Sequence, residues 1–294
     1  SSNTSGMVGK TDAESDEMKT ETFEAEGQDS DGIYYDGERD RLYQVNRSDS
    51  KLVAYADVQA DINTSLLDVS VSLTSTSNFQ NGRGLAVKDN KYIVAQDGSD
   101  LFPNKFVIYE ETDGRLEFSM SLETNINLWG LRMVGDDLYA VVDNSSDVAI
   151  YNDFLTNNND GQMVMPDHVI TIEGLVRTHG IIYDTEDDLM VLTDVGAASS
   201  DSDGALFFIE NWSSFRNSDS VSASNYTRIA GGNTMLGNPV DVAYDNVTKM
   251  AYVAERAREG GLLLAFRASA TGDVSPDKMT TFEGASSLFL YRGK

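Results

Sequence analysis

The stretch GIIYDTEDDLMVLTD, from Gly180 to Asp194, consists of two apolar runs joined by an Asp-rich turn, and the chain repeats this pattern. The other copies are GIYYDGERDRLYQV (from Gly32), GLAVKDNKYIVAQD (from Gly84), GLRMVGDDLYAVVD (from Gly130) and DVAYDNVTKMAYVAE (from Asp241). A fragment of a further copy, SLFLY, begins at Ser287. A repeat of about 45–60 residues built from short strands is typical of a β-propeller.

Each copy predicts a blade of four antiparallel strands. In the copy that opens at Gly180, the strands are expected at residues 181–183, 189–193, 206–209 and 226–229. The first run is almost continuously apolar, as strands buried on both faces are. The Asp, Asn and Gly residues between the first two runs favour tight hairpin turns. We therefore expect the first strand of each copy to lie innermost in its blade.

The two ends of the chain predict how the ring closes. Residues 19–26 (KTETFEAE) are similar to the outer strand KMTTFEG at residues 278–284, and residues 287–291 are similar to an inner strand. Pairing N- and C-terminal strands in one blade would remove an open sheet edge. We predict an all-β propeller of six four-stranded blades over residues 19–294, closed in this way. Because only five clear middle-strand pairs occur, five blades is the alternative.

The charge of the chain limits its partners. There are 48 acidic and 22 basic residues, a net charge of −26, so the surface repels nucleic-acid backbones and anionic lipids. No run approaches the length of a membrane-spanning helix, and no cysteine is present, which excludes disulfides and thiolate metal sites. We expect no binding of nucleic acid and no membrane insertion.

Residues 1–18 predict a flexible, acidic N-terminal tether. They resemble the segment that follows a processed signal peptide or a lipid-attachment cysteine in exported bacterial proteins. On this interpretation the protein is extracytoplasmic (periplasmic, cell-surface or secreted), as a lipoprotein with its anchor upstream of residue 1. A plain disordered N-terminus is the alternative.

Over Gly32 to Tyr291 the repeats resemble those of the NHL, YVTN and related surface-layer propeller families. The resemblance implies the architecture alone, since these families include lactonases, sugar-acid hydrolases, peptide-amidating lyases and binding scaffolds. The chain contains no G-x-S-x-G, H-E-x-x-H, P-loop or G-x-G-x-x-G motif. The common enzyme classes that these motifs mark are therefore not indicated.

Superposition of the repeats locates a candidate site at one mouth of the central channel. The residues just before the small opening residue of each copy are Asp31, Arg83, Trp129, His179, Val240 and Ser286. A structural position would converge on one residue type, whereas this set differs in every copy. We therefore expect a ligand, either a small molecule or a protein or peptide, to bind at this mouth; chance variation at an exposed rim is the alternative.

A second, nearly uniform ring lies at the end of the second strand of each copy: Arg47, Asp97, Asp143, Asp194 and Glu255. Uniform carboxylates there indicate a structural role, in which they accept backbone N–H groups of the following turn. Calcium binding, which uses oxygen ligands, is the alternative role for these carboxylates. A separate calcium site is expected at the channel mouth if the protein is a hydrolase, with Asp31, Asn238 and Asp241 as its oxygen ligands.

Two functions follow from these residues. In the first, the protein is a non-catalytic binding or scaffold module, and Asp31, Arg83, Trp129, Arg132, His179, Asp241 and Arg256 bind the ligand. The arginines would seat a carboxylate, unless they form ordinary salt bridges. In the second, it is a lactonase or sugar-ester hydrolase with a divalent cation, and His179 is the general base. The absence of catalytic motifs favours the first.

Overall fold

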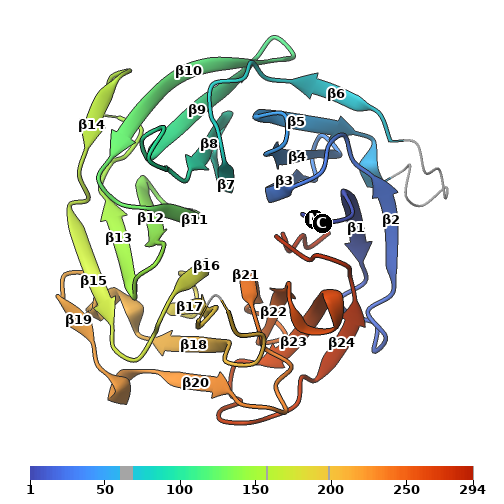
Figure 1. Cartoon of the computed structure of the whole chain (residues 1–294), viewed down its shortest axis with the longest axis vertical. Coiled ribbons are helices and arrows are strands. Elements are labelled where there is room, and N and C mark those ends of the chain that lie inside the picture. The colour runs from blue at the N-terminus through green and yellow to red at the C-terminus, as the bar shows by residue number, and fades with distance from the viewer. Residues whose placement is uncertain (60–68, 157, 198, 294) are drawn as a thin grey trace.

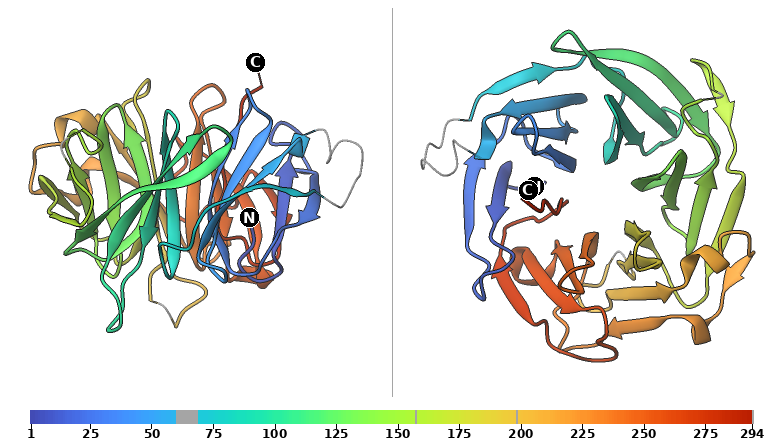
Figure 2. Two further views of the ribbon diagram at one scale, coloured as in Figure 1. Left: turned by 90° about the horizontal axis from the view of Figure 1, so that it is seen from above. Right: turned by 180° about the vertical axis from the view of Figure 1, so that it is seen from behind.

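The computed structural model describes residues 1–59, 69–156, 158–197 and 199–293, and it is a propeller of five blades around a central channel (Figure 1). In every blade the first strand in the chain lies next to the channel and the following strands lie progressively further out (Figure 2). None of the helices among the described residues is long and apolar enough to cross a membrane. The prediction of an all-β propeller is confirmed.

The blades follow one another in chain order. The first contains β3 (Ser30–Asp36), β4 (Arg41–Asn46), β5 (Lys51–Ala56) and β6 (Val71–Thr74). The second contains β7 (Gly82–Lys88), β8 (Lys91–Gln96), β9 (Lys105–Thr112) and β10 (Arg115–Thr124). The third contains β11 (Leu128–Val134), β12 (Asp137–Val142), β13 (Asp147–Tyr151) and β15 (His168–Ile172).

The fourth blade contains β16 (Thr178–Asp184), β17 (Leu189–Asp194), β18 (Ala205–Glu210) and β20 (Thr227–Ala230). The fifth contains β21 (Pro239–Asp245), β22 (Met250–Glu255), β23 (Leu262–Arg267) and β24 (Lys278–Thr281). Two outer edges receive a short parallel strand from a later part of the chain: β14 (Gln162–Val164) pairs with β10, and β19 (Ser220–Val221) pairs with β15. These additions cover edges that would otherwise be open for intermolecular pairing.

The prediction of six blades is wrong, and the five-blade alternative is the observed one. Between the fifth and first blades lie the two-stranded hairpin of β1 (Met7–Thr11) and β2 (Thr20–Glu24) and, on the channel side, the C-terminal segment (Figure 1). Residues 287–291, expected to supply an inner strand, form no strand. The physical reason is that no middle-strand pair exists to join the two parts into one sheet, so this sector is filled without becoming a blade.

The two ends of the chain meet, but not in a shared blade. Ser2 and Ala285 form an isolated antiparallel bridge, and Asn3 N donates to Gly284 O at 3.0 Å. Residues 1–18, for which a flexible tether was expected, include β1 and the buried side chains of Val8 and Met18. This segment is therefore packed against the propeller, where it helps to fill the gap between the last and first blades.

The small residues that open the repeats are required by close approach of the inner strands. A Cβ added to Gly130 would lie 2.2 Å from His179 O, and one added to Gly84 would lie 2.4 Å from Trp129 O. From the first blade to the fifth, each inner strand passes within van der Waals distance of the next at this level. The glycines therefore fix the spacing of the backbone that carries the site.

Candidate functional site

Each inner strand carries an irregularity at the position predicted for the site. The register of the innermost pair shifts between Ser30 and Ile33 in the first blade, and equivalent shifts occur in the other four. Such bulges reorient a side chain out of the regular alternation and are common beside functional sites. They lie at Asp31, Arg83, Trp129, His179 and Val240, which explains why these side chains meet at the channel mouth.

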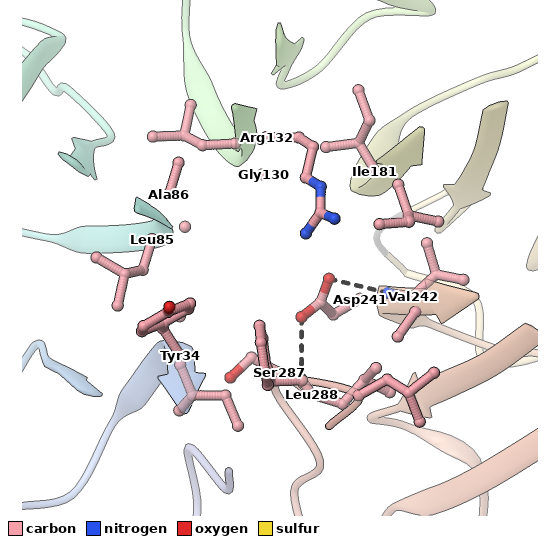
Figure 3. A pocket seen from close by; sticks show the side chains of 18 of the residues that line it. Tyr34, Leu85, Ala86, Gly130, Arg132, Ile181, Asp241, Val242, Ser287 and Leu288 are labelled. Atoms are coloured by element: carbon pink, nitrogen blue, oxygen red, sulfur yellow. Dashed lines mark hydrogen bonds between the residues drawn. The ribbon is translucent and has the colours of Figure 1, made fainter. Parts of the chain in front are cut away.

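The central channel contains a cavity of about 510 Å³, within the usual range for small-molecule sites. All six residues of the predicted mouth ring line it, and so do Arg132 and Asp241. Deeper in the channel, the wall is largely apolar and includes Leu85, Ile181 and Val242 (Figure 3). The structure thus brings most of the predicted ligand-binding residues to one cavity.

Trp129 lies between two positively charged or protonatable groups at the mouth. Its ring and that of His179 are stacked, with centroids 3.7 Å apart and an interplanar angle of 4°. The guanidinium carbon of Arg83 lies 3.9 Å from the centroid of the same indole, within cation–π range. Because the three residues come from consecutive blades, the stack ties the second, third and fourth blades together.

The imidazole of His179 is held by an acid from the neighbouring blade. Its Nε2 lies 3.1 Å from Asp143 Oδ1, and Arg177 Nε donates to the same oxygen at 2.8 Å. Burial lowers the pKa of His179 despite the carboxylate. Burial acts to raise the pKa of Asp143, but the hydrogen bonds from His179 and Arg177 hold it at about 2. The pair is therefore a neutral imidazole beside an ionised carboxylate at neutral pH.

On the other side of Trp129, a chain of ion pairs runs around the mouth. Asp31 lies 3.2 Å from Arg47 and 3.4 Å from Arg83, and Arg83 lies 3.2 Å from Asp97. Burial raises the pKa of Asp31 to about 6, and burial together with the charge of Asp143 raises that of Asp97 to about 6. The mouth thus contains several carboxylates that titrate close to neutrality.

The outer ring of acids serves two purposes. Asp194 accepts backbone N–H groups of Val176, Arg177 and Gly196, and Glu255 accepts those of residues 237, 238, 257 and 258. For these two, the predicted turn-capping role is confirmed. Asp143 accepts the backbone N–H of Asn144 at 2.8 Å and also binds Arg177, whereas Asp97 binds Arg83. Their position in the repeat was visible in the sequence, but their partners were not.

Arg132 and Asp241 lie deeper in the channel, and in Figure 3 the guanidinium of Arg132 points into the cavity on the side of Asp241. Asp241 occupies the place held by the opening glycine in the preceding copies. Its oxygens accept the N–H of Val242 at 2.9 Å and of Leu288 at 3.0 Å. The carboxylate therefore fastens the C-terminal segment to the last blade. Burial raises its pKa to about 6.

Two predicted residues lie outside the cavity wall. Arg256 Nε donates to Asn3 Oδ1 at 3.1 Å, and the backbone of Asn238 donates to Glu255. Of the three oxygen ligands expected for calcium, only Asp31 and Asp241 line the cavity. Among the described residues, no group of three or more His, Cys, Asp or Glu side chains is arranged to hold a metal ion. Calcium binding therefore stays a prediction, and no arranged set of metal ligands among the described residues supports it.

The site also contains partners that the sequence reasoning did not assign. Asp143 and Arg177 both contact the His179 neighbourhood, and residues 287–290 form one wall of the cavity. The only available signal for Arg177 was its proximity to His179 in the chain. Asp241, a carboxylate where the four preceding copies have glycine, was expected among the ligand-binding residues and does line the cavity.

No protein-family model and no curated protein matches this chain. Solved structures do match. A propeller in a nidogen/laminin complex shares a TM-score of 0.61 at 11% identity, covering 91% of this chain and 88% of that one. Hydrazine synthase of Kuenenia stuttgartiensis gives a TM-score of 0.58 at 12% identity, covering 90% of this chain and 71% of that one.

A putative 6-phosphogluconolactonase of Bacteroides fragilis NCTC 9343 gives a TM-score of 0.51 at 14% identity, covering 87% of this chain and 68% of that one. At such low identities these similarities establish the fold alone. They support the β-propeller repeat architecture, whereas the NHL- and YVTN-type resemblance stays a prediction. This chain is a five-bladed β-propeller with a lined axial cavity.

Proposed function

We propose that the protein is a binding module that holds a small molecule in its central channel and that it acts outside the cytoplasm. The observation that supports the binding role is the axial cavity of about 510 Å³, whose mouth displays a different side chain from every blade. A varied set of charged and aromatic groups above an apolar interior is the usual composition of a selective ligand site. The extracytoplasmic location rests on the N-terminal sequence alone.

The environment of His179 favours binding over hydrolysis. Its side chain is 5% exposed, its Nε2 is engaged by Asp143, and its Nδ1 is buried with no partner among the described residues. A general base must come within hydrogen-bonding reach of the proton that it removes. The stacked Trp129 covers one face of the imidazole, and neither ring nitrogen is open to a substrate, since Nε2 is engaged by Asp143 and Nδ1 is buried.

The test uses one variant that fills the channel and one matched control. Leu85→Trp places an indole in the cavity, whereas Leu101→Trp places the same group at a side chain that is 90% exposed. A small-molecule panel is screened by thermal shift, and hits are measured by calorimetry. We expect a ligand whose affinity falls by about tenfold or more in Leu85→Trp and stays unchanged in Leu101→Trp.

The rival function, a hydrolase, is tested on the same protein. Turnover of lactones or sugar esters that is abolished by His179→Gln would overturn the binding-module proposal. So would a panel in which every bound compound binds Leu85→Trp as tightly as the unmodified protein, because the ligand would then lie outside the channel.

A further inference from the structure

Arg132 is a cation in an apolar part of the channel. It comes from the middle of β11, and the cavity wall at this depth includes Leu85, Ala86, Ile181, Ile182, Val242 and Leu288. In Figure 3 its guanidinium extends from the strand into the open space of the cavity. Two further arginines line the cavity, and both have acidic partners: Arg83 at the mouth pairs with Asp31 and Asp97, and Arg292 pairs with Asp245.

In the described part of the chain, Arg132 makes no hydrogen bond and no ion pair within 4 Å, so its donors face the cavity unused. Desolvation lowers the pKa of Arg132, and the more distant charges of Asp241 and Asp184 only partly offset this effect. A guanidinium has five N–H donors, and Arg132 is half-buried at the cavity wall. These donors are therefore open to a ligand that enters the cavity.

The two nearest carboxylates already have partners. Asp241 accepts the backbone N–H groups of Val242 and Leu288, and Asp184 accepts the amide of Asn246 and the backbone N–H of Glu186. Neither carboxylate forms a hydrogen bond or ion pair with Arg132, since each accepts hydrogen bonds from other groups. The missing acceptor is therefore expected to come from outside the chain.

We propose that Arg132 binds the carboxylate of an amphipathic small molecule, whose apolar body packs on the surrounding aliphatic side chains. This inference rests on the proposed function, because it names the ligand class of the same cavity. The planar fork of arginine matches a carboxylate with two parallel hydrogen bonds. The aliphatic side chains around Arg132 lower the local dielectric constant, so a charge-assisted bond formed there is stronger than in bulk water.

The test compares hexanoate with its neutral analogue hexanamide by calorimetry at neutral pH. Both have the same aliphatic body, so their difference reports the anionic group. We expect hexanoate to bind about tenfold or more tightly than hexanamide to the unmodified protein. Arg132→Met should abolish this preference, and Arg132→Lys should retain part of it. Arg267→Met, at an exposed arginine paired with Asp277, is the matched control and should bind as the unmodified protein does.

The outcomes separate this inference from the proposed function. If hexanoate and hexanamide bind equally and Leu85→Trp weakens both, the channel binds ligands but the carboxylate assignment is overturned. If hexanoate binds but Arg132→Met leaves its affinity unchanged, Arg132 is not the anchor. If neither hexanoate nor benzoate binds at millimolar concentration, while panel compounds of another class do bind in the channel, the ligand class is also overturned.

Discussion

The indole of Trp129 and the imidazole of His179 are stacked nearly parallel, with ring centroids 3.7 Å apart, although they belong to neighbouring blades. The stack positions the imidazole so that its Nε2 faces Asp143, which also belongs to the blade of Trp129. Ring stacking and a charge-assisted hydrogen bond thus act across the same blade interface. The mouth of the channel is a rigid, preorganised surface, as selective binding requires.

The first prediction concerns Asp143. Asp143→Ala leaves Arg177 and His179 without their shared acceptor in a largely buried place, so we expect a loss of about 2–3 kcal/mol in the free energy of unfolding. The measurement is urea denaturation followed by circular dichroism. Asp136→Ala is the control, since its 63% exposed side chain binds Lys88 at the surface, and it should cost less than about 1 kcal/mol. Equal effects of the two substitutions would contradict a structural role for the Asp143 cluster.

The second prediction concerns the glycines of the inner strands. In Gly130→Ala the new methyl group meets a backbone carbonyl at 2.2 Å, and neighbouring inner strands must separate. We expect a loss of about 3 kcal/mol in the free energy of unfolding, near the upper end for overpacking. Gly232→Ala is the matched control, because nothing lies within 4 Å of the added Cβ. If both variants unfold at the same urea concentration, the five blades are not as closely spaced as described.

The third prediction concerns Asp241 and pH. Its folded-state pKa of about 6 lies above the ordinary value of 3.8, so the folded protein binds this proton more tightly than the unfolded chain does. Stability therefore rises as pH falls from about 6 toward 4, by about 2 kcal/mol for this group. In Asp241→Asn this contribution disappears, so the free energy of unfolding should rise less between pH 7 and pH 4.5 than it does in the unmodified protein.

Other groups titrate in the same window, so the comparison between variants is the informative quantity. Asp31 and Asp97 act in the same direction as Asp241, whereas the lowered pKa of His179 acts in the opposite one. All three are retained in Asp241→Asn. A profile unchanged by the substitution would show that Asp241 is not the buried acid that the structure indicates.

The fourth prediction concerns the cost of the binding site itself. Because Arg132 is desolvated and has no partner among the described residues, Arg132→Met should raise the free energy of unfolding of the ligand-free protein by about 1 kcal/mol. Arg267→Met should leave it unchanged or slightly lower, since its exposed ion pair with Asp277 contributes little. Thermal unfolding of the three proteins checks this. A destabilised Arg132→Met variant would mean that the cation is structurally satisfied.

The repeat made much of this architecture predictable. Equivalent positions such as Arg83 and Trp129 could be placed at one mouth of the channel because every copy of the sequence repeat has the same strand order. The number of blades was harder to predict from the sequence. The terminal segments are similar to single strands of the repeat, but this similarity does not show whether they pair in one sheet. The hairpin of β1 and β2 lacks the intervening strands, and that absence decided the count.

The partners within the site were not predictable in the same way. The contact between His179 and Asp143 crosses a blade interface and depends on a bulge in each inner strand. The isolation of Arg132 depends on which carboxylates already have backbone donors, and this follows only from three-dimensional placement. Residue types at equivalent repeat positions indicate where a site lies. Which side chains form hydrogen bonds or ion pairs with one another there depends on the three-dimensional arrangement of the blades.

The most direct test of the central claim, that the axial cavity is the ligand site, is a crystal structure with 6-bromohexanoate and its bromine anomalous signal. The account predicts a bromine peak within the channel and a carboxylate within hydrogen-bonding distance of Arg132. A bromine peak confined to the outer surface of the blades, with the channel free of ligand density, would contradict it.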